Sequence, residues 1–101
     1  MKKSYELSCL GIDGVAYPYE TAIMKVQSYI DKQIPIIGGD VFLLEDKSLR
    51  STDDSWYCER MPNEPYTDYV YRCGNVARDY INTYVKINGN HMLFSLVVQS
   101  R

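Results

Sequence analysis

Three carboxylates and two aromatic rings gather in one short segment of the chain, at Asp53, Asp54, Trp56, Tyr57 and Glu59. Neighbouring carboxylates can act as a general acid and base when they converge in a pocket. No catalytic motif accompanies them, so a solvated surface explains them better than an active site does. Exposed aromatic rings among acids are typical of protein-binding surfaces, which makes these five residues the candidate partner-binding site. Trp56 is the only Trp of the chain, and the alternative is that it anchors the core.

A second feature is the run Gly38-Gly39-Asp40 inside the apolar segment from Ile36 to Leu44. Two adjacent glycines in a strand predict either a positive φ angle or a close backbone approach at one of them. The run superficially resembles the Gly-Gly-Asp-Glu-Phe signature of diguanylate cyclases. However, Val41 stands where that signature has its metal-binding Glu, and the chain is too short for that domain. We therefore interpret Gly38, Gly39 and Asp40 as a structural motif.

The other reactive residue types form no catalytic or metal-binding pattern. His91 is the only histidine, and Cys9, Cys58 and Cys73 contain no Cys-x-x-Cys pair, so no zinc-ligand spacing exists. No phosphate-binding loop, dinucleotide-binding fingerprint or serine elbow is present. We expect no metal, no cofactor and no enzymatic activity. The odd number of cysteines favours reduced thiols, with Cys73 as a small core residue.

Charge is distributed unevenly along the chain, although the net charge is only −2. Residues 40–68 carry eight acids and three bases, whereas residues 69–101 carry four bases and one acid. The acidic middle makes nucleic acid a poor partner and a basic protein a better one. The longest apolar run, residues 92–98, is far shorter than the roughly 20 residues of a membrane span. The N-terminal segment meets Glu6 before any apolar leader develops, so we expect a cytoplasmic protein that does not bind membranes.

The periodicity of apolar residues predicts both helices and strands. Apolar residues recur at three- and four-residue steps in two segments, which predicts a helix from Pro18 to about Lys32 and a longer helix from Tyr66 to Tyr84. Alternating or β-branched segments predict four strands, at Ser4 to Leu10, Ile36 to Leu44, Trp56 to Glu59 and His91 to Val98. The pair Asn88-Gly89 is a hairpin signal, so a hairpin and a helix end are both open at that point.

This order of elements predicts an α+β fold with an antiparallel sheet of about four strands and two helices packed on one face, in a single domain spanning residues 1–101. Gly74 lies inside the second predicted helix, which indicates tight packing there because glycine weakens helices. The expected core consists of residues on the apolar stripes, namely Ile23, Val26, Ile36, Val41, Val70, Cys73, Val76, Tyr80, Phe94 and Leu96.

Three segments of the chain resemble a known family. They are Ile37-Gly38-Gly39-Asp40-Val41-Phe42, Asp54-Ser55-Trp56-Tyr57 and Tyr80-Ile81-Asn82-Thr83-Tyr84. These segments are similar to the motifs of immunity protein family forty of bacterial polymorphic toxin systems. Ser55 departs from the Asn of the family pattern, and the similarity extends from Leu10 to Val98.

The resemblance implies a cytoplasmic immunity protein, or antitoxin, that binds and neutralises one cognate toxin by protein–protein interaction. A toxin whose active site engages an anion would present basic residues to the acidic and aromatic segment. The alternative is a small ligand-binding or enzymatic domain with a pocket near Asp40 and Trp56. A regulatory subunit of an unrelated protein is a third class that the sequence does not separate, and the identity of the toxin, its activity and the oligomeric state are not encoded in these motifs.

Overall fold

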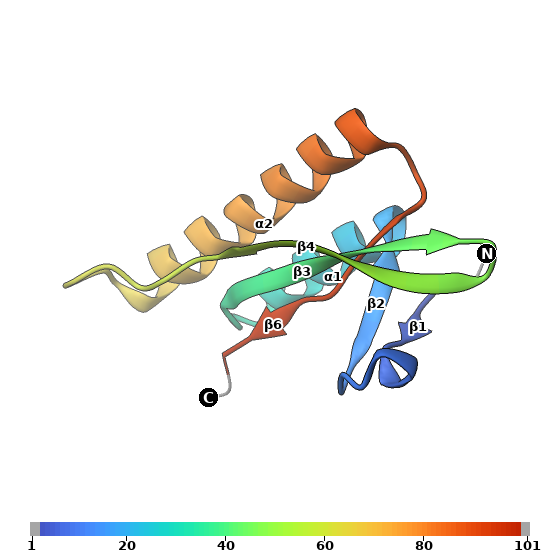
Figure 1. Ribbon diagram of the computed structural model, residues 1–101. Coiled ribbons are helices and arrows are strands. Elements are labelled where there is room, and N and C mark those ends of the chain that lie inside the picture. The colour runs from blue at the N-terminus through green and yellow to red at the C-terminus, as the bar shows by residue number, and fades with distance from the viewer. Residues whose placement is uncertain (1–2, 100–101) are drawn as a thin grey trace.

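The computed structural model describes residues 3–99, so the two ends of the predicted domain 1–101 lie outside the described residues (Figure 1). Within this range the chain forms an α+β fold with two α-helices and six strands. In chain order the elements are β1 (Tyr5–Glu6), the 3-10 helix η1 (Ser8–Leu10), β2 (Val15–Pro18), α1 (Tyr19–Asp31), β3 (Ile36–Glu45), β4 (Ser48–Tyr57), α2 (Tyr66–Asn88), β5 (Met92–Phe94) and β6 (Val97–Val98). No helix in this part of the chain is both long enough and apolar enough to cross a membrane.

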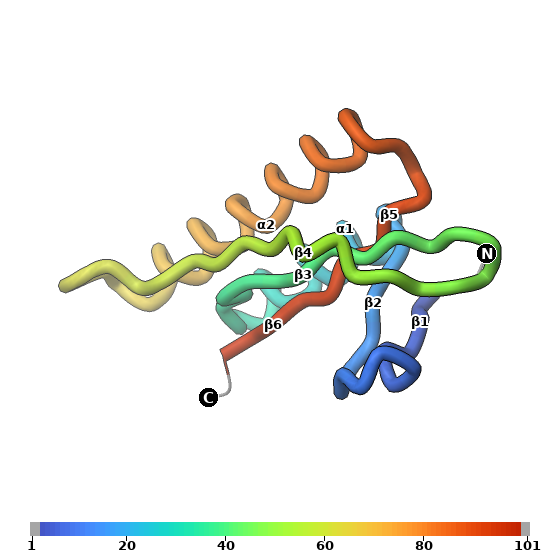
Figure 2. Tube along the Cα trace, viewed as in Figure 1, coloured from blue at the N-terminus to red at the C-terminus, as the bar shows by residue number. Residues whose placement is uncertain are grey.

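The sheet is antiparallel and is built around the long strand β3. Its strand order is β1-β2-β5-β3-β4, and the short β6 pairs with β3 beyond the end of β5. β3 and β4 form a hairpin that turns at Asp46 and Lys47, whose φ angles are 49° and 66°. Figure 2 shows the two strands of this hairpin running side by side along most of the molecule. Among the described residues no further strand pairs with the outer side of β4, which is therefore an edge strand.

Both helices cover one face of the sheet and form the main core with it (Figure 1). Pro18 directly precedes α1, a place where the fixed φ angle and the missing N–H of proline are tolerated. Along both helices, apolar residues at helical spacing point toward the core. The helices meet at Gly74, where a Cβ atom would overlap the side chain of Ile30. The buried residues of this core are Ala22, Val26, Ile30, Ile36, Val41, Trp56, Ala77, Ile81, Met92 and Phe94. The tight packing expected at Gly74 is therefore confirmed.

The opposite face of the sheet carries a second, smaller group of buried residues. Leu7, just before η1, packs against Ala16, Phe42 and Leu93, and these four buried side chains form a second small cluster. Phe42 and Leu93 belong to this cluster, whereas their neighbours Val41 and Phe94 belong to the main core. This division follows from the alternation of side chains along a strand. The N-terminal segment thus lies over β2, β5 and β3 on this face.

The predicted fold class is confirmed, with six strands where about four were expected. Of the predicted core, Val26, Ile36, Val41, Val70, Cys73 and Phe94 are buried, and Ile23, Val76, Tyr80 and Leu96 pack partly buried around them. The two extra strands arise because β2 was not predicted and because the last strand is divided into β5 and β6. A third correction concerns the length of β4, which begins at Ser48 rather than near Trp56.

The physical reasons for these differences are local. The first half of β4 is polar because an edge strand exposes much of its surface, so it lacks the apolar alternation that predicts a strand. The segment expected to form one strand from Ser4 to Leu10 folds instead into β1 and η1. At Asn88-Gly89 the helix alternative is correct: α2 continues to Asn88, and Gly89 ends it with a φ of 89° and an N–H that donates to the Val85 carbonyl.

Candidate functional site

The candidate site begins at a bulge in the edge strand β4. The register of the β3–β4 pair shifts between Asp40 and Phe42, and Asp53 on the opposing segment has a φ of 65°. Thr52 holds the bulge: its hydroxyl donates to the Val41 carbonyl at 2.9 Å and accepts from the Asp54 N–H at 3.1 Å. A bulge re-aims the side chains that follow it and disrupts the strand edge. It leaves Asp53 and Asp54 exposed on the outer strand of the sheet.

Trp56 belongs to the core, which answers the question that the sequence left open. Its side chain is only 7% exposed, and its ring stacks on Tyr80 of α2 with 4.8 Å between ring centroids. The ring also lies over Gly39, where any Cβ atom would overlap it. Among the described residues, no hydrogen-bond partner reaches the indole N–H of Trp56. Trp56 therefore joins the sheet to α2 and is not an exposed aromatic anchor.

The two glycines confirm the close-approach alternative. Gly38 and Gly39 do not have positive φ angles. Instead, a Cβ at Gly38 would overlap the Trp56 carbonyl, and one at Gly39 would overlap both the Ser95 carbonyl and the Trp56 ring. Beside them, the Asp40 backbone N–H donates to the Ser95 hydroxyl at 3.1 Å, and its side chain is exposed. The glycines thus allow β3 to approach β4 and the segment after β5 closely.

Tyr57 projects from the sheet on the opposite side from Trp56, because successive side chains of a strand alternate between faces. It is 78% exposed, which makes it the most exposed large apolar side chain among the described residues. Asp54, two residues before Trp56, lies on the helix side, where its carboxylate accepts a hydrogen bond of 2.7 Å from the Tyr84 hydroxyl. Burial and this hydrogen bond both raise the pKa of Tyr84, so the phenol stays a donor. The predicted site residues therefore share a sheet edge and not a single face.

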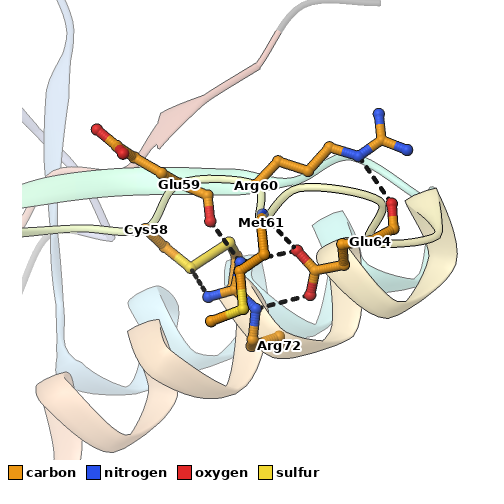
Figure 3. Close-up of polar contacts among 7 residues, drawn as sticks. Cys58, Glu59, Arg60, Met61, Glu64 and Arg72 are labelled. Carbon is orange, nitrogen blue, oxygen red and sulfur yellow. Dashed lines mark hydrogen bonds and ion pairs between the residues drawn. A yellow bond between two sulfur atoms is a disulfide. The ribbon is translucent and has the colours of Figure 1, made fainter.

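Immediately after β4 the chain is fastened to α2, as Figure 3 shows. Cys58 and Cys73 form a disulfide across a Cα–Cα distance of 5.6 Å, which contradicts the expectation of reduced thiols. Arg72, the neighbour of Cys73, donates to both carboxylate oxygens of Glu64 at 2.7 and 2.9 Å and also to the Glu59 carbonyl. Its hydrogen bonds, with that of the Met61 N–H, lower the pKa of Glu64 to about 2. In Figure 3 the Glu59 carboxylate points away from α2.

Sequence reasoning missed both the disulfide and the ion pair that link this segment to α2. The cysteines are 15 residues apart and lie on a strand end and a helix, so their spacing matches no disulfide or metal motif. Glu64 and Arg72 are eight residues apart, a separation at which no local rule pairs side chains. Cys58, Cys73, Glu64 and Arg72 meet because the chain, after leaving β4, returns along α2, and this path is a feature of the tertiary structure.

Two hollows of the surface, with volumes of about 620 and 520 Å³, lie beside β2 and the start of α1. They share Lys3, Thr21 and Met24, and neither is lined by Asp40 or Trp56. Within residues 3–99 no group of three His, Cys, Asp or Glu side chains is arranged to hold a metal ion.

We define the acidic edge as the exposed residues Asp53, Asp54, Tyr57 and Glu59 at the end of β4. It combines three exposed carboxylates and one exposed aromatic ring along the end of an edge strand, residue types that are common where a protein contacts another macromolecule.

Comparison with known proteins agrees with a protein of the immunity class. The chain matches the family model described as Immunity protein 40 over residues 6–98, which is nearly the whole chain. It therefore belongs to the Immunity protein 40 family. No curated protein matches the chain.

Proposed function

We propose that this protein is a bacterial antitoxin that binds and neutralises a cognate toxin of a polymorphic toxin system through its acidic edge. The observation that carries the proposal is Tyr57, a 78% exposed ring at the end of an edge strand that also carries the exposed Asp53 and Asp54, in a chain of an immunity protein family. Aromatic residues are strongly enriched among the residues that dominate binding energy. Leaving such a ring exposed has no benefit for the isolated fold.

The charge of the acidic edge indicates the chemistry of the partner. Asp53, Asp54 and Glu59 are all exposed, so their charges act on an approaching surface over about a Debye length. A toxin that acts on nucleic acid or on another anion needs basic residues at its active site, and these are complementary to the acidic edge. The antitoxin would then occupy the toxin's substrate site. This role needs no catalysis, cofactor, nucleic acid or membrane, and it places the protein in the cytoplasm, where the toxin must be blocked.

The direct test is copurification of the protein with the product of a neighbouring toxin-like gene, followed by an assay of toxin inhibition. Charge reversal of Asp53 and Asp54 to Lys should slow association by about tenfold at low salt and much less at high salt, because these carboxylates steer encounter. Tyr57→Ala should mainly speed dissociation. The matched control reverses the exposed Glu6 on β1 and the exposed Asp13 in the turn before β2, and should change neither rate.

Two results would contradict the proposal. One is a toxin that is bound and inhibited equally well by the charge-reversed, Tyr57→Ala and wild-type proteins, which would place the contact elsewhere. The other is the absence of binding to any neighbouring toxin candidate together with binding of a small molecule near Asp40 and Trp56. That second result would favour the ligand-binding alternative.

A further inference from the structure

The disulfide between Cys58 and Cys73 closes a segment that has no helix or strand of its own. Residues 59–65 connect β4 to α2, and the disulfide fastens their start to the second turn of the helix. Cys58 is the more accessible of the two residues at 6% exposed, and Cys73 is fully buried in a cluster with Tyr69. Cys9, by contrast, is a free and exposed cysteine on η1.

A second set of contacts holds the same segment without the sulfur–sulfur bond. The bidentate ion pair of Arg72 with Glu64 links its end to the helix, and the Met61 N–H donates to the same carboxylate at 3.0 Å. Arg60 adds a bond of 3.0 Å from its Nε to the Glu64 carbonyl. Breaking the disulfide would therefore loosen residues 59–65 without detaching them, and neither cysteine belongs to the main core.

One contact of the disulfide affects how easily it is reduced. The Arg72 guanidinium places Nη1 at 3.0 Å from Cys58 Sγ. In the disulfide that sulfur is neutral, whereas after reduction a thiolate there would gain a charge-assisted hydrogen bond. A cation beside a cysteine favours the thiolate, and stabilising the reduced form makes a disulfide easier to reduce. Disulfides in reducing compartments are usually catalytic or redox-sensing and rarely permanent.

We propose that Cys58–Cys73 is a reversible redox site that exchanges with low-molecular-weight thiols, and that its state sets how firmly residues 59–65 are held against α2. A small-molecule thiolate attacks Cys58 Sγ, a new sulfur–sulfur bond forms as the protein disulfide breaks, and Cys73 leaves as a thiolate and takes up a proton. A second thiolate attacks the small-molecule sulfur of the mixed disulfide and releases Cys58 as a thiolate beside Arg72. Two small thiols are oxidised to one disulfide, and the protein disulfide is reduced.

The redox state has a consequence for partner binding that rests on the proposed function. Tyr57 and Glu59 lie on either side of Cys58, so the disulfide limits the motion of the C-terminal end of the acidic edge. The oxidised form is then the better-ordered toxin-binding form, because less conformational entropy is lost on binding. Reduction should speed dissociation of the toxin by several-fold.

The first experiment measures the equilibrium itself. The full-length protein in a Cys9→Ser background is equilibrated in glutathione buffers at pH 7, free thiols are alkylated, and the mass shows how many cysteines reacted. We expect a disulfide in oxidising buffer and two alkylated thiols in a buffer with the glutathione ratio of a reducing cytosol. Free thiols in oxidising buffer, or a disulfide that is reduced only when denaturant unfolds the protein, would overturn the proposal.

A matched pair of variants separates the redox role of Arg72 from its structural role. Arg72→Gln removes the cation at Cys58 and should shift the glutathione equilibrium about tenfold toward the disulfide, the size of one charge-assisted hydrogen bond. Glu64→Gln breaks the same ion pair but leaves the guanidinium free for the thiolate, so it should shift the equilibrium toward the reduced form. If the equilibrium shifted in the same direction in both variants, Arg72 would have only a structural role, and its proposed stabilisation of the Cys58 thiolate would be wrong.

Hydrogen exchange then locates the structural response in the wild-type protein. Reduction should speed amide exchange in residues 59–65 by about tenfold while β3 and α1 keep their protection. If amide exchange in residues 59–65 did not change on reduction, the redox state would not determine how firmly this segment is held, and that part of the proposal would be refuted. Toxin dissociation is measured separately from the two redox forms. If no toxin binds either form, the proposed function fails while the thiol and exchange measurements still decide the redox site.

Discussion

Trp56 and Tyr57 are adjacent aromatic residues with opposite surroundings, and truncating each to Ala should separate stability from binding. Trp56 is 7% exposed and stacks on Tyr80, whereas Tyr57 is 78% exposed. Truncating a buried large aromatic residue costs about 3–5 kcal/mol because contacts are lost and a cavity remains. The indole N–H of Trp56 has no partner among the described residues, and losing that buried donor recovers about 1–3 kcal/mol. Taking the middle of both ranges, we expect Trp56→Ala to cost about 2 kcal/mol and Tyr57→Ala about 0.5 kcal/mol or less.

The assay is urea unfolding followed by far-ultraviolet circular dichroism, since the Trp56 variants lose the only Trp fluorescence. A domain of this size has a total stability of about 5–15 kcal/mol, so a loss of this size lowers the midpoint clearly and can leave the protein folded. Trp56→Phe is the intermediate variant, because it keeps a ring against Tyr80 and removes the unpaired N–H. It should cost less than Trp56→Ala. Equal midpoints for the Trp56→Ala and Tyr57→Ala proteins would refute the assignment of the two faces.

Two further predictions concern close packing and pH. Gly39→Ala should destabilise the fold by about 1–3 kcal/mol, because its Cβ would overlap the Ser95 backbone carbonyl as well as the Trp56 ring. Urea unfolding checks this against Ser55→Ala on the facing strand, and equal stability of the two variants would disprove the close approach. The pKa of Glu64 is lowered to about 2 by its hydrogen bonds to Arg72 and Met61. A lowered pKa stabilises the fold above the ordinary value of about 4.5, and this contribution is lost as the pH falls from about 4.5 to 2. In Glu64→Gln the free energy of unfolding should therefore change less steeply with pH in that window. If the slope were unchanged, the ion pair of Glu64 with Arg72 would not be the cause of the pH dependence.

Much of the architecture was predictable because periodicity in the sequence reports which residues face the core. The apolar steps from Tyr19 to Ile30 correspond to α1, and those from Tyr66 onward correspond to α2. The β-branched run at Ile36 corresponds to β3, the central strand. Adjacent glycines in a strand correctly indicated a close backbone approach. These features depend on near neighbours in the chain, so a single sequence contains them.

The sequence suggested the residues of the candidate site, but their arrangement in space could not be derived from it. The strand period requires Trp56 and Tyr57 to lie on opposite faces, yet it does not say which face the helices will cover. That choice depends on α2, whose Tyr80 lies 24 residues beyond Trp56 and stacks on it.

The sequence by itself determined the two helices, the central strand, the family motifs and the acidic, aromatic segment that marks the candidate site. Only the tertiary structure decided that Trp56 is core and Tyr57 is surface, that β4 is an edge strand, and that Cys58 meets Cys73. The physical reason is the range of the interactions involved. Periodicity and propensity act over a few residues, whereas burial, strand pairing and disulfide formation depend on which distant segments the folded chain brings together.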